Sequence, residues 1–306
     1  MNLPKNHAAY VIELSHLFAD GATYYDVLNL LHRAVNSAPM PDLKWVPAPP
    51  NIIFPDCYSD EDRQIVGGGW IPGYEEKAAK YAPGTANERV VDVRLVNKEA
   101  VAALKEEYGH TSPAKVRGVP FLSTNDLLTA AVAELADEGG QTWMYANMRG
   151  RAPGATHDLA GNYERAIHFP AALGANDPAF IRGLIGPEKF VYYGREGNPR
   201  VSSDKTREEV EKCNIHLISN WANLTHVMVP PGCKLIGHTA IVMSFPGFDF
   251  SVVFRADAEG TLGFLTNYVG GYRGQELADR ISNSKIFSRL FSAPTSPAMV
   301  ASKQPQ

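Results

Sequence analysis

The alternation of apolar and polar positions predicts that the chain opens with a strand, a short loop and a helix. Residues 9–15 have the two-residue period of a strand. From Thr23 the period becomes that of an amphipathic helix, and Thr23 and Asp26 have the spacing of a capping box. The expected apolar face of this helix consists of Tyr24, Val27, Leu28, Leu31 and Val35.

Regular patterns are absent from about residue 38 to 84, where prolines recur around Gly67-Gly68-Gly69. This region is typical of a long crossover or linker. Beyond it, we expect strands at 89–96, 142–147, 163–169, 216–220, 239–245, 248–255 and 261–267, and helices at 98–108 and from Ser123. Helices and strands alternate without a regular βαβ rhythm, which indicates a mixed-sheet α/β layer fold. The residues from about Ser292 onward have the composition of a disordered tail.

Composition narrows the class of protein. The 306 residues are 44% hydrophobic and 20% charged, with a net charge of -4, so no basic surplus favours nucleic acid. The three cysteines form no CxxC pair, which argues against a disulfide framework or a metal site. No apolar run has membrane-span length and no signal core begins the chain, so a cytoplasmic location is expected.

The candidate chemistry lies in His16-Leu17-Phe18-Ala19-Asp20-Gly21. A histidine at a strand end titrates near neutrality, and it can take a proton from a hydroxyl or amine that attacks a carbonyl. Asp20 can hold the loop behind the imidazole. The alternative is a surface loop with an incidental histidine, an aspartate that caps the next helix and a glycine for the turn.

Three further segments give this motif a context. They are Leu122-Ser123-Thr124-Asn125-Asp126-Leu127-Leu128-Thr129-Ala130, then Asn147-Met148-Arg149-Gly150-Arg151 with Gly161-Asn162, and Ile218-Ser219-Asn220-Trp221. Together with the HxxxDG pattern, and in the same order, they resemble the motifs of the plant and fungal BAHD acyltransferases, whose superfamily includes chloramphenicol acetyltransferase. The resemblance implies the mixed-sheet fold of the coenzyme-A-dependent acyltransferases.

The resemblance also implies a role for each matching residue. His16 is the general base, Asp20 pairs with Arg149 (or with Arg151) behind the Gly21 turn, and Ser219 and Trp221 lie near the tetrahedral oxyanion. Ser123, Thr124 and Asn162 are the expected coenzyme-A-binding residues.

Each of these residues also has an ordinary structural explanation. Ser123 and Asp126 fit a capping box, the two arginines fit a solvated surface, Gly161-Asn162 fits a turn, and Trp221 fits a hydrophobic core.

The sequence departs from the family in two ways. Only residues 1–15 precede the motif where the family has a further half-domain, and the late DFGWG motif is absent. We therefore expect residues 1–43 to be a remnant of an N-terminal half, 44–86 a crossover linker, 87–285 the C-terminal acyltransferase half and 286–306 a flexible tail. Ser15 stands where condensation-type relatives have a second histidine, which favours the BAHD-like interpretation.

The sequence thus predicts transfer of an acyl group from acyl-coenzyme A, a co-substrate rather than a bound cofactor, to a small-molecule alcohol or amine. No metal, nucleic acid or membrane span is expected, and exposed sheet edges make self-association possible. Two alternatives are open: a catalytically inactive fragment or interaction module, and a condensation-type enzyme that takes its acyl group from a carrier protein.

Overall fold

The computed structural model describes twelve parts of the chain. These are residues 5–14, 19–46, 89–110, 119, 121–135, 141–151, 154–170, 176–185, 215–224, 227–240, 249–269 and 271–289.

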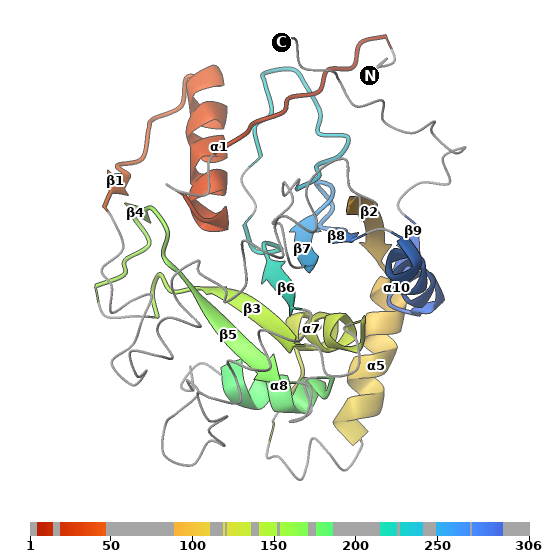
Figure 1. Cartoon of the computed structure of the whole chain (residues 1–306). Coiled ribbons are helices and arrows are strands. Elements are labelled where there is room, and N and C mark those ends of the chain that lie inside the picture. The colour runs from red at the N-terminus through yellow and green to blue at the C-terminus, as the bar shows by residue number, and fades with distance from the viewer. Residues whose placement is uncertain are drawn as a thin grey trace, which may run out of the picture.

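A seven-stranded sheet forms the centre of the molecule (Figure 1). Its order is β5-β3-β6-β7-β8-β2-β9, in which β3, β6 and β7 run parallel and the other neighbours run antiparallel, so the sheet is mixed. The strands are β2 (Arg89–Val96), β3 (Gln141–Asn147), β5 (Glu164–Pro170), β6 (Ile215–Asn220), β7 (Asp249–Arg255), β8 (Leu262–Val269) and β9 (Phe287–Arg289).

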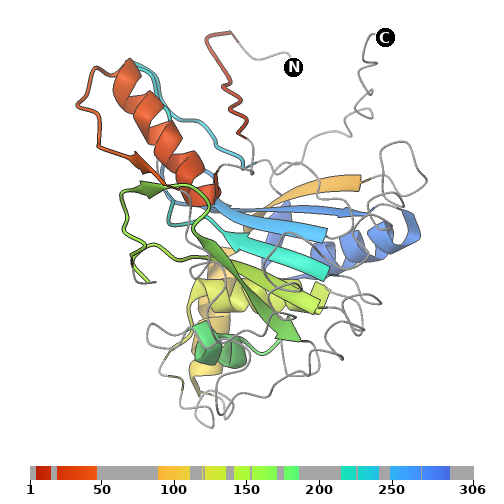
Figure 2. The same ribbon diagram turned by 60° about the vertical axis from the view of Figure 1, so that its left-hand side comes forward.

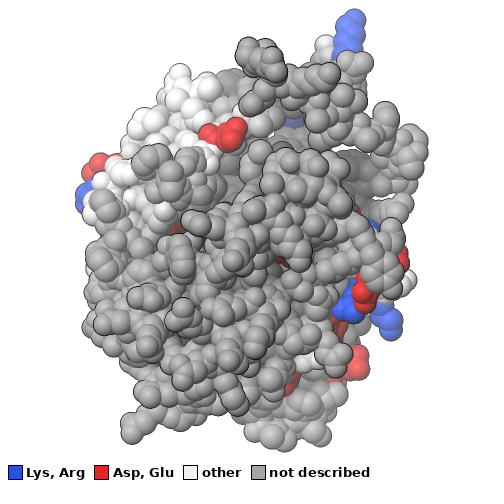
Figure 3. Space-filling model, viewed as in Figure 1, with Lys and Arg blue, Asp and Glu red and all other residues white. Residues whose placement is uncertain are grey.

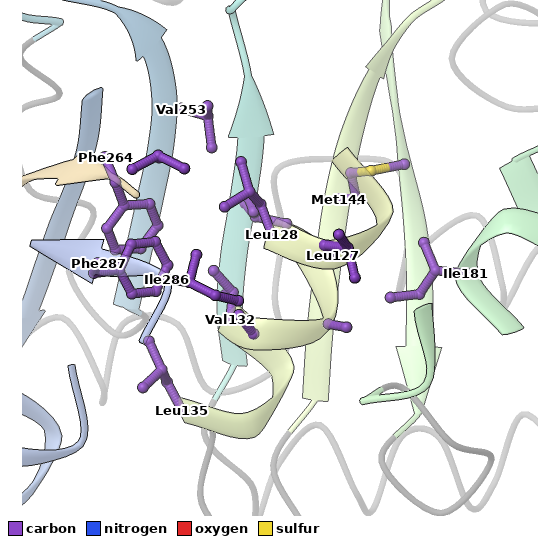
Figure 4. Close-up of a cluster of buried hydrophobic side chains, with 14 of the residues drawn as sticks. Leu127, Leu128, Val132, Leu135, Met144, Ile181, Val253, Phe264, Ile286 and Phe287 are labelled. Atoms are coloured by element: carbon purple, nitrogen blue, oxygen red, sulfur yellow. The ribbon is translucent and has the colours of Figure 1, made fainter. Parts of the chain in front are cut away.

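Four helices cover one face of this sheet. They are α5 (Lys98–His110), α7 (Thr124–Leu135), α8 (Pro178–Ile185) and α10 (Gly271–Asn283). Helix α7 is the most deeply buried, and Figure 4 shows its Leu128 and Val132 inside the main hydrophobic cluster. Phe264 and Phe287 stack in the same cluster with ring centroids 4.2 Å apart, which fixes β9 at the edge of the sheet.

The opposite face carries a second apolar cluster that includes Trp143, Leu217, Phe250 and Phe254. Helix α1 (Gly21–Val35) stands on this side, away from the other helices (Figure 2). Beside it, β1 (Lys44–Trp45) and β4 (Leu159–Ala160) form a small parallel sheet. The described surface where α1 lies is mostly uncharged (Figure 3).

The fold class and most of the predicted elements are confirmed. The β7–β8 hairpin turns at Asp257 as expected, where the side chain accepts a bond from the Thr261 N–H. The hydrophobic pattern predicts no helix at α8 or α10 and no strand at β1, β4 or β9. In α10 the spacing of Leu277 and Ile281, four residues apart on the buried face, was a usable signal.

Two predictions on local structure were wrong. Residues 9–14 form no strand, and Tyr10 and Val11 are 60% and 80% exposed, because a strand needs a neighbour for its backbone bonds and none lies beside them among the described residues. Residues 239 and 240 are likewise not in a strand, and 241–245 lie outside the described residues.

The structure describes residues at the edges of two of the predicted ranges, the linker and the tail. Residues 44–46 of the expected linker are described and include β1, whereas 47–86 lie outside the described residues. Residues 286–289 of the expected tail belong to the fold, because β9 pairs with β2.

Candidate active site

The turn that begins α1 is held by Asp20. Its backbone is extended and its Oδ1 accepts the Thr23 N–H at 2.9 Å, which makes Asp20 the N-cap of the helix. The predicted cap at Thr23 is therefore wrong, because the helix is capped by Asp20, three residues earlier, which accepts the Thr23 N–H. His16 itself, with residues 15–18, lies outside the described residues.

Asp20 forms a buried ion pair with Arg149. The Arg149 Nη1 lies 2.7 Å from Asp20 Oδ2, and both side chains are 2% exposed. The same Oδ2 accepts the Tyr163 N–H at 2.7 Å. The pair that the resemblance implies is thus present, and it joins α1 to the segment after β3 across 129 residues of sequence.

Every N–H of the Arg149 guanidinium has an acceptor. Besides its carboxylate partner, it donates to Leu159 O (2.6 Å), Asn147 Oδ1 (3.2 Å), Thr23 Oγ1 (3.0 Å) and Gly161 O (2.9 Å). A buried charge is tolerated when its partner and its hydrogen bonds are complete, and this one meets both conditions. The network fixes the α1 turn in one geometry.

Gly161 has a structural role that the sequence left open. Its φ is +141°, and a Cβ there would lie 2.8 Å from the Val46 carbonyl oxygen, so only glycine fits. Its carbonyl and N–H both bond to Thr23 Oγ1, at 2.8 and 2.9 Å. Thr23 and Gly161 therefore lock the base of α1 to β4, and neither was predicted to do so.

Trp221 lies directly on the Gly21 turn. A Cβ at Gly21 would be 2.5 Å from the indole Nε1, so the turn tolerates no side chain there. The indole N–H donates to Ser219 Oγ at 2.8 Å. Since Ser219 Oγ accepts this bond, its own hydroxyl proton is available to another acceptor. The ordinary alternative for Trp221, a role in the core, is also partly true, because it packs against the second apolar cluster.

The start of α7 reaches the same end of the sheet. Asn220 Nδ2 donates to Asn125 Oδ1 at 2.7 Å, which links the segment carrying Ser219 to the first turn of α7. Ser123 and Asp126 form the predicted capping box: the Ser123 N–H donates to Asp126 Oδ2 at 2.6 Å and the Asp126 N–H to Ser123 Oγ at 3.3 Å.

Lys105 is a residue that the sequence analysis missed. From α5 its Nζ donates to Thr124 Oγ1 at 2.9 Å, which puts a cation beside the first turn of α7. A helix N-terminus and an adjacent ammonium group both favour a phosphate or other anion. The usable signal in the sequence was that Lys105 lies within the helix predicted at 98–108.

Tyr24 and Tyr25 surround Trp221 with uncharged phenols. Each ring makes an edge contact with the indole at a centroid distance of 6.1 Å. Burial, helped by the negative charges of Glu164 and Asp20, raises the pKa of Tyr24 to about 12. Burial raises the pKa of Tyr25 as well. Both hydroxyls therefore stay protonated near neutral pH.

The structure thus brings together Asp20, Gly21, Arg149, Ser219 and Trp221, and links them to the start of α7. Arg151 does not join this group, and Asn162 lies apart from the other expected coenzyme-A-binding residues, Ser123 and Thr124. Arg151 is exposed in the turn after β3, and Arg149 alone makes the ion pair with the motif aspartate. Asn162 follows Gly161 beside the Asp20 network, whereas Ser123 and Thr124 stand at α7.

Among the described residues, no group of three or more His, Cys, Asp or Glu side chains is arranged to hold a metal ion. In the same part of the chain, no helix has the length and apolarity needed to cross a membrane.

Comparison with known proteins supports the fold. No protein-family model and no curated protein matches the sequence. Among solved structures, F. graminearum TRI101 complexed with coenzyme A and T-2 mycotoxin has a TM-score of 0.50 at 14% identity, over 88% of this chain and 62% of that one. Polyketide synthase associated protein 5 from Mycobacterium tuberculosis has a TM-score of 0.48 at 14% identity, over 87% of this chain and 70% of that one. Vinorine synthase has a TM-score of 0.42 at 14% identity, over 86% of this chain and 59% of that one.

The chain has the mixed-sheet layer fold of the coenzyme-A-dependent acyltransferase type, as the resemblance implies. It spans 62% of the length of TRI101 in that structure.

Proposed function

We propose that the chain is an acyltransferase that moves an acyl group from acyl-coenzyme A to an alcohol or amine, with His16 as general base. The observation that carries the proposal is the buried Asp20–Arg149 pair, which holds the turn four residues after His16 in a single geometry. The TRI101 structure, with its coenzyme A and T-2 mycotoxin, supports it at the level of the fold.

In the proposed reaction His16 takes the proton of the acceptor hydroxyl or amine as that group attacks the thioester carbonyl. The new carbon–oxygen or carbon–nitrogen bond gives a tetrahedral intermediate with a negatively charged oxygen. The carbon–sulfur bond then breaks, and the proton held by His16 passes to the leaving thiolate. Free coenzyme A and the acylated acceptor result.

Ser219 is the proposed donor to the oxyanion. Its hydroxyl proton is available because its Oγ already accepts the Trp221 N–H at 2.8 Å. A hydroxyl that accepts one hydrogen bond becomes a better donor of the next. This revises the role expected for Trp221: its indole N–H acts through Ser219 instead of contacting the oxyanion.

The proposed coenzyme A site lies at the first turn of α7, where Ser123 and Thr124 begin the helix. Lys105 adds a positive charge within 2.9 Å of Thr124 Oγ1. The charge and the free N–H groups of the turn suit the phosphates of coenzyme A. Asn162, on the Asp20 side, is proposed to lie toward the thioester end.

The test is acyl transfer from a panel of acyl-coenzyme A donors to alcohol and amine acceptors. We expect His16→Ala to abolish the transfer that the wild type shows, because the attacking group then keeps its proton. The matched control is His7→Ala, at an exposed histidine, which should keep wild-type rates. Equal rates in the wild type and His16→Ala would reject His16 as the base.

A non-catalytic binding module is the second candidate, and the observation that favours it is that the bonds of Asp20 and Arg149 with each other, with Thr23 and with Gly161 hold the α1 turn in place. It predicts coenzyme A binding by calorimetry without transfer to any acceptor. The carrier-dependent alternative is tested in the same assay with acylated carrier protein as the donor. Transfer from the carrier but not from acyl-coenzyme A would favour it.

A further inference from the structure

We propose that Tyr25 and His238 are positioning residues that hold the Trp221 indole against the Asp20–Gly21 turn. This inference rests on the acyltransferase function proposed above. It concerns residues outside the four motif segments, on α1 and on the segment 227–240 that runs beside it (Figures 1 and 2).

His238 is fixed by β7 in one tautomer. Its Nδ1 lies 2.8 Å from the Arg255 carbonyl oxygen, which can only accept, so Nδ1 carries the proton. The His238 backbone N–H also donates to Ala256 O at 2.8 Å. Ring and backbone are therefore both anchored to the end of β7, and Nε2 of the neutral ring is left as an acceptor. Burial lowers the pKa of His238, which favours this neutral form.

Tyr25 supplies the donor to that acceptor. Its hydroxyl lies 3.2 Å from His238 Nε2, and the residue is 3% exposed. The two rings meet edge to face at 5.5 Å. Because Tyr25 is on the first turns of α1, this bond ties the helix to His238 across 213 residues of sequence, and through His238 to the end of β7.

The same tyrosine forms one wall of the Trp221 site. The Tyr25 and Trp221 rings are nearly perpendicular, at 79° and 6.1 Å, and Trp221 in turn contacts the Gly21 turn. The Trp221 backbone N–H donates to Val253 O at 2.7 Å. Trp221 and Tyr25 are therefore both held in place by bonds that lead to β7. Movement of Tyr25 would let the indole move, and its N–H would leave Ser219 Oγ.

The far end of the segment is tied to α1 as well. The Val229 N–H donates to His32 Nδ1 at 3.2 Å, and Asn36 Nδ2 donates to Val229 O at 3.0 Å. The segment is thus fastened near both ends of the helix, which makes the Tyr25–His238 bond the fastening on the side of the catalytic turn.

The chemistry of His238 allows its two bonds to be tested separately. In His238→Gln an amide oxygen can take the place of Nε2 and accept from Tyr25. In His238→Asn the shorter amide can replace only the Nδ1 donor. We expect Tyr25→Phe and His238→Asn to lower kcat about tenfold with KM for acyl-coenzyme A unchanged, because the donor geometry at Ser219 is lost but the coenzyme A site is not. His238→Gln should restore most of kcat.

The matched control is Tyr108→Phe, at a half-buried tyrosine on the opposite face of the sheet. It removes a hydroxyl without touching Trp221 and should leave kcat unchanged. A role limited to core packing predicts instead that kcat follows thermal stability in all variants, with no advantage of Gln over Asn.

Two readouts need no substrate. Nitrogen-15 NMR of the histidine rings should show the Nδ1–H tautomer for His238. Hydrogen exchange of the Trp221 indole N–H, identified by its loss in Trp221→Phe, should be faster in Tyr25→Phe and His238→Asn than in the wild type, Tyr108→Phe or His238→Gln.

An Nε2–H tautomer, or unchanged indole exchange in Tyr25→Phe, overturns the positioning proposal whatever the activity. A wild type that transfers no acyl group overturns the proposed function, while the exchange result still decides whether the pair holds the indole.

Discussion

Replacing Arg149 by Met should destabilise the fold strongly, although the methionine side chain fills most of the space that the arginine side chain occupies. Methionine has similar length, so the main loss is the cation and its five hydrogen bonds. The Asp20 carboxylate then stays buried at 2% exposure without its countercharge.

The size of the effect follows from which acceptors keep a partner. Asp20 Oδ2 keeps the Tyr163 N–H, Gly161 O keeps the Thr23 hydroxyl, and Asn147 Oδ1 keeps the backbone N–H of residue 149. Leu159 O loses the Arg149 Nε–H, but it is a neutral carbonyl oxygen. The dominant cost is therefore the unpaired buried charge, which is typically about 3–5 kcal/mol. At about 2 °C per kcal/mol for a chain of this size, Tm should fall by about 6–10 °C.

Thermal unfolding followed by circular dichroism measures this directly. The matched control is Arg280→Met, which breaks the exposed ion pair with Glu276, whose side chains are 41% and 50% exposed. That pair should contribute less than about 1 kcal/mol, so its Tm should shift by no more than about 2 °C. Adding Asp20→Asn to Arg149→Met should recover part of the loss, because the buried charge is removed and the asparagine Oδ1 still caps α1. The recovery is incomplete because the asparagine amide nitrogen cannot accept the Tyr163 N–H.

Equal Tm values for Arg149→Met and Arg280→Met would refute the reasoning, since the burial of the pair would then have no energetic consequence. A double variant no more stable than Arg149→Met would place the cost in the lost contacts of the guanidinium and of the Tyr163 N–H instead of the unpaired charge.

Three further predictions follow from the site. Gly21→Ala puts a Cβ 2.5 Å from the indole and should lower kcat at least about tenfold, whereas Gly183→Ala in α8, with open space around its Cβ, should gain up to about 1 kcal/mol in unfolding free energy. Ser219→Ala should lower kcat about 100-fold with little change in KM in steady-state assays, and an unchanged kcat would reject it as the oxyanion donor. Lys105→Ala should raise KM for acyl-coenzyme A about fivefold with kcat unchanged, while Lys98→Ala on the exposed side of α5 should leave both alone; equal KM values would remove Lys105 from the coenzyme A site.

Features set by neighbours in sequence were predicted well. The Ser123–Asp126 capping box is one, because both partners lie within a single turn of α7. The same rule failed at Thr23, where a second candidate cap, Asp20, lay three residues before it and a long-range ion pair held that candidate in place. Two local patterns competed there, and a distant residue decided between them.

Features set by distant residues needed either a family resemblance or the structure. The Asp20–Arg149 pair was expected only because the surrounding motifs resemble those of the BAHD acyltransferases. No local pattern indicates that Tyr25 and His238 meet, since their contact depends on the end of β7. Residues 9–14 alternate as a strand does but form none. A strand also needs a partner strand, and the local pattern of hydrophobic residues carries no information on whether one lies beside it.

The position of β2 has a consequence for how the chain is made on the ribosome. This strand is translated well before its two neighbours in the sheet, β8 and β9. Until they emerge, both edges of β2 are open, and the strand carries Val90 and Val91, which stay 41% and 53% exposed even in the folded chain. The nascent chain therefore carries an unpaired apolar strand until β8 and β9 have emerged, and during that interval chaperones that bind extended apolar segments can meet it.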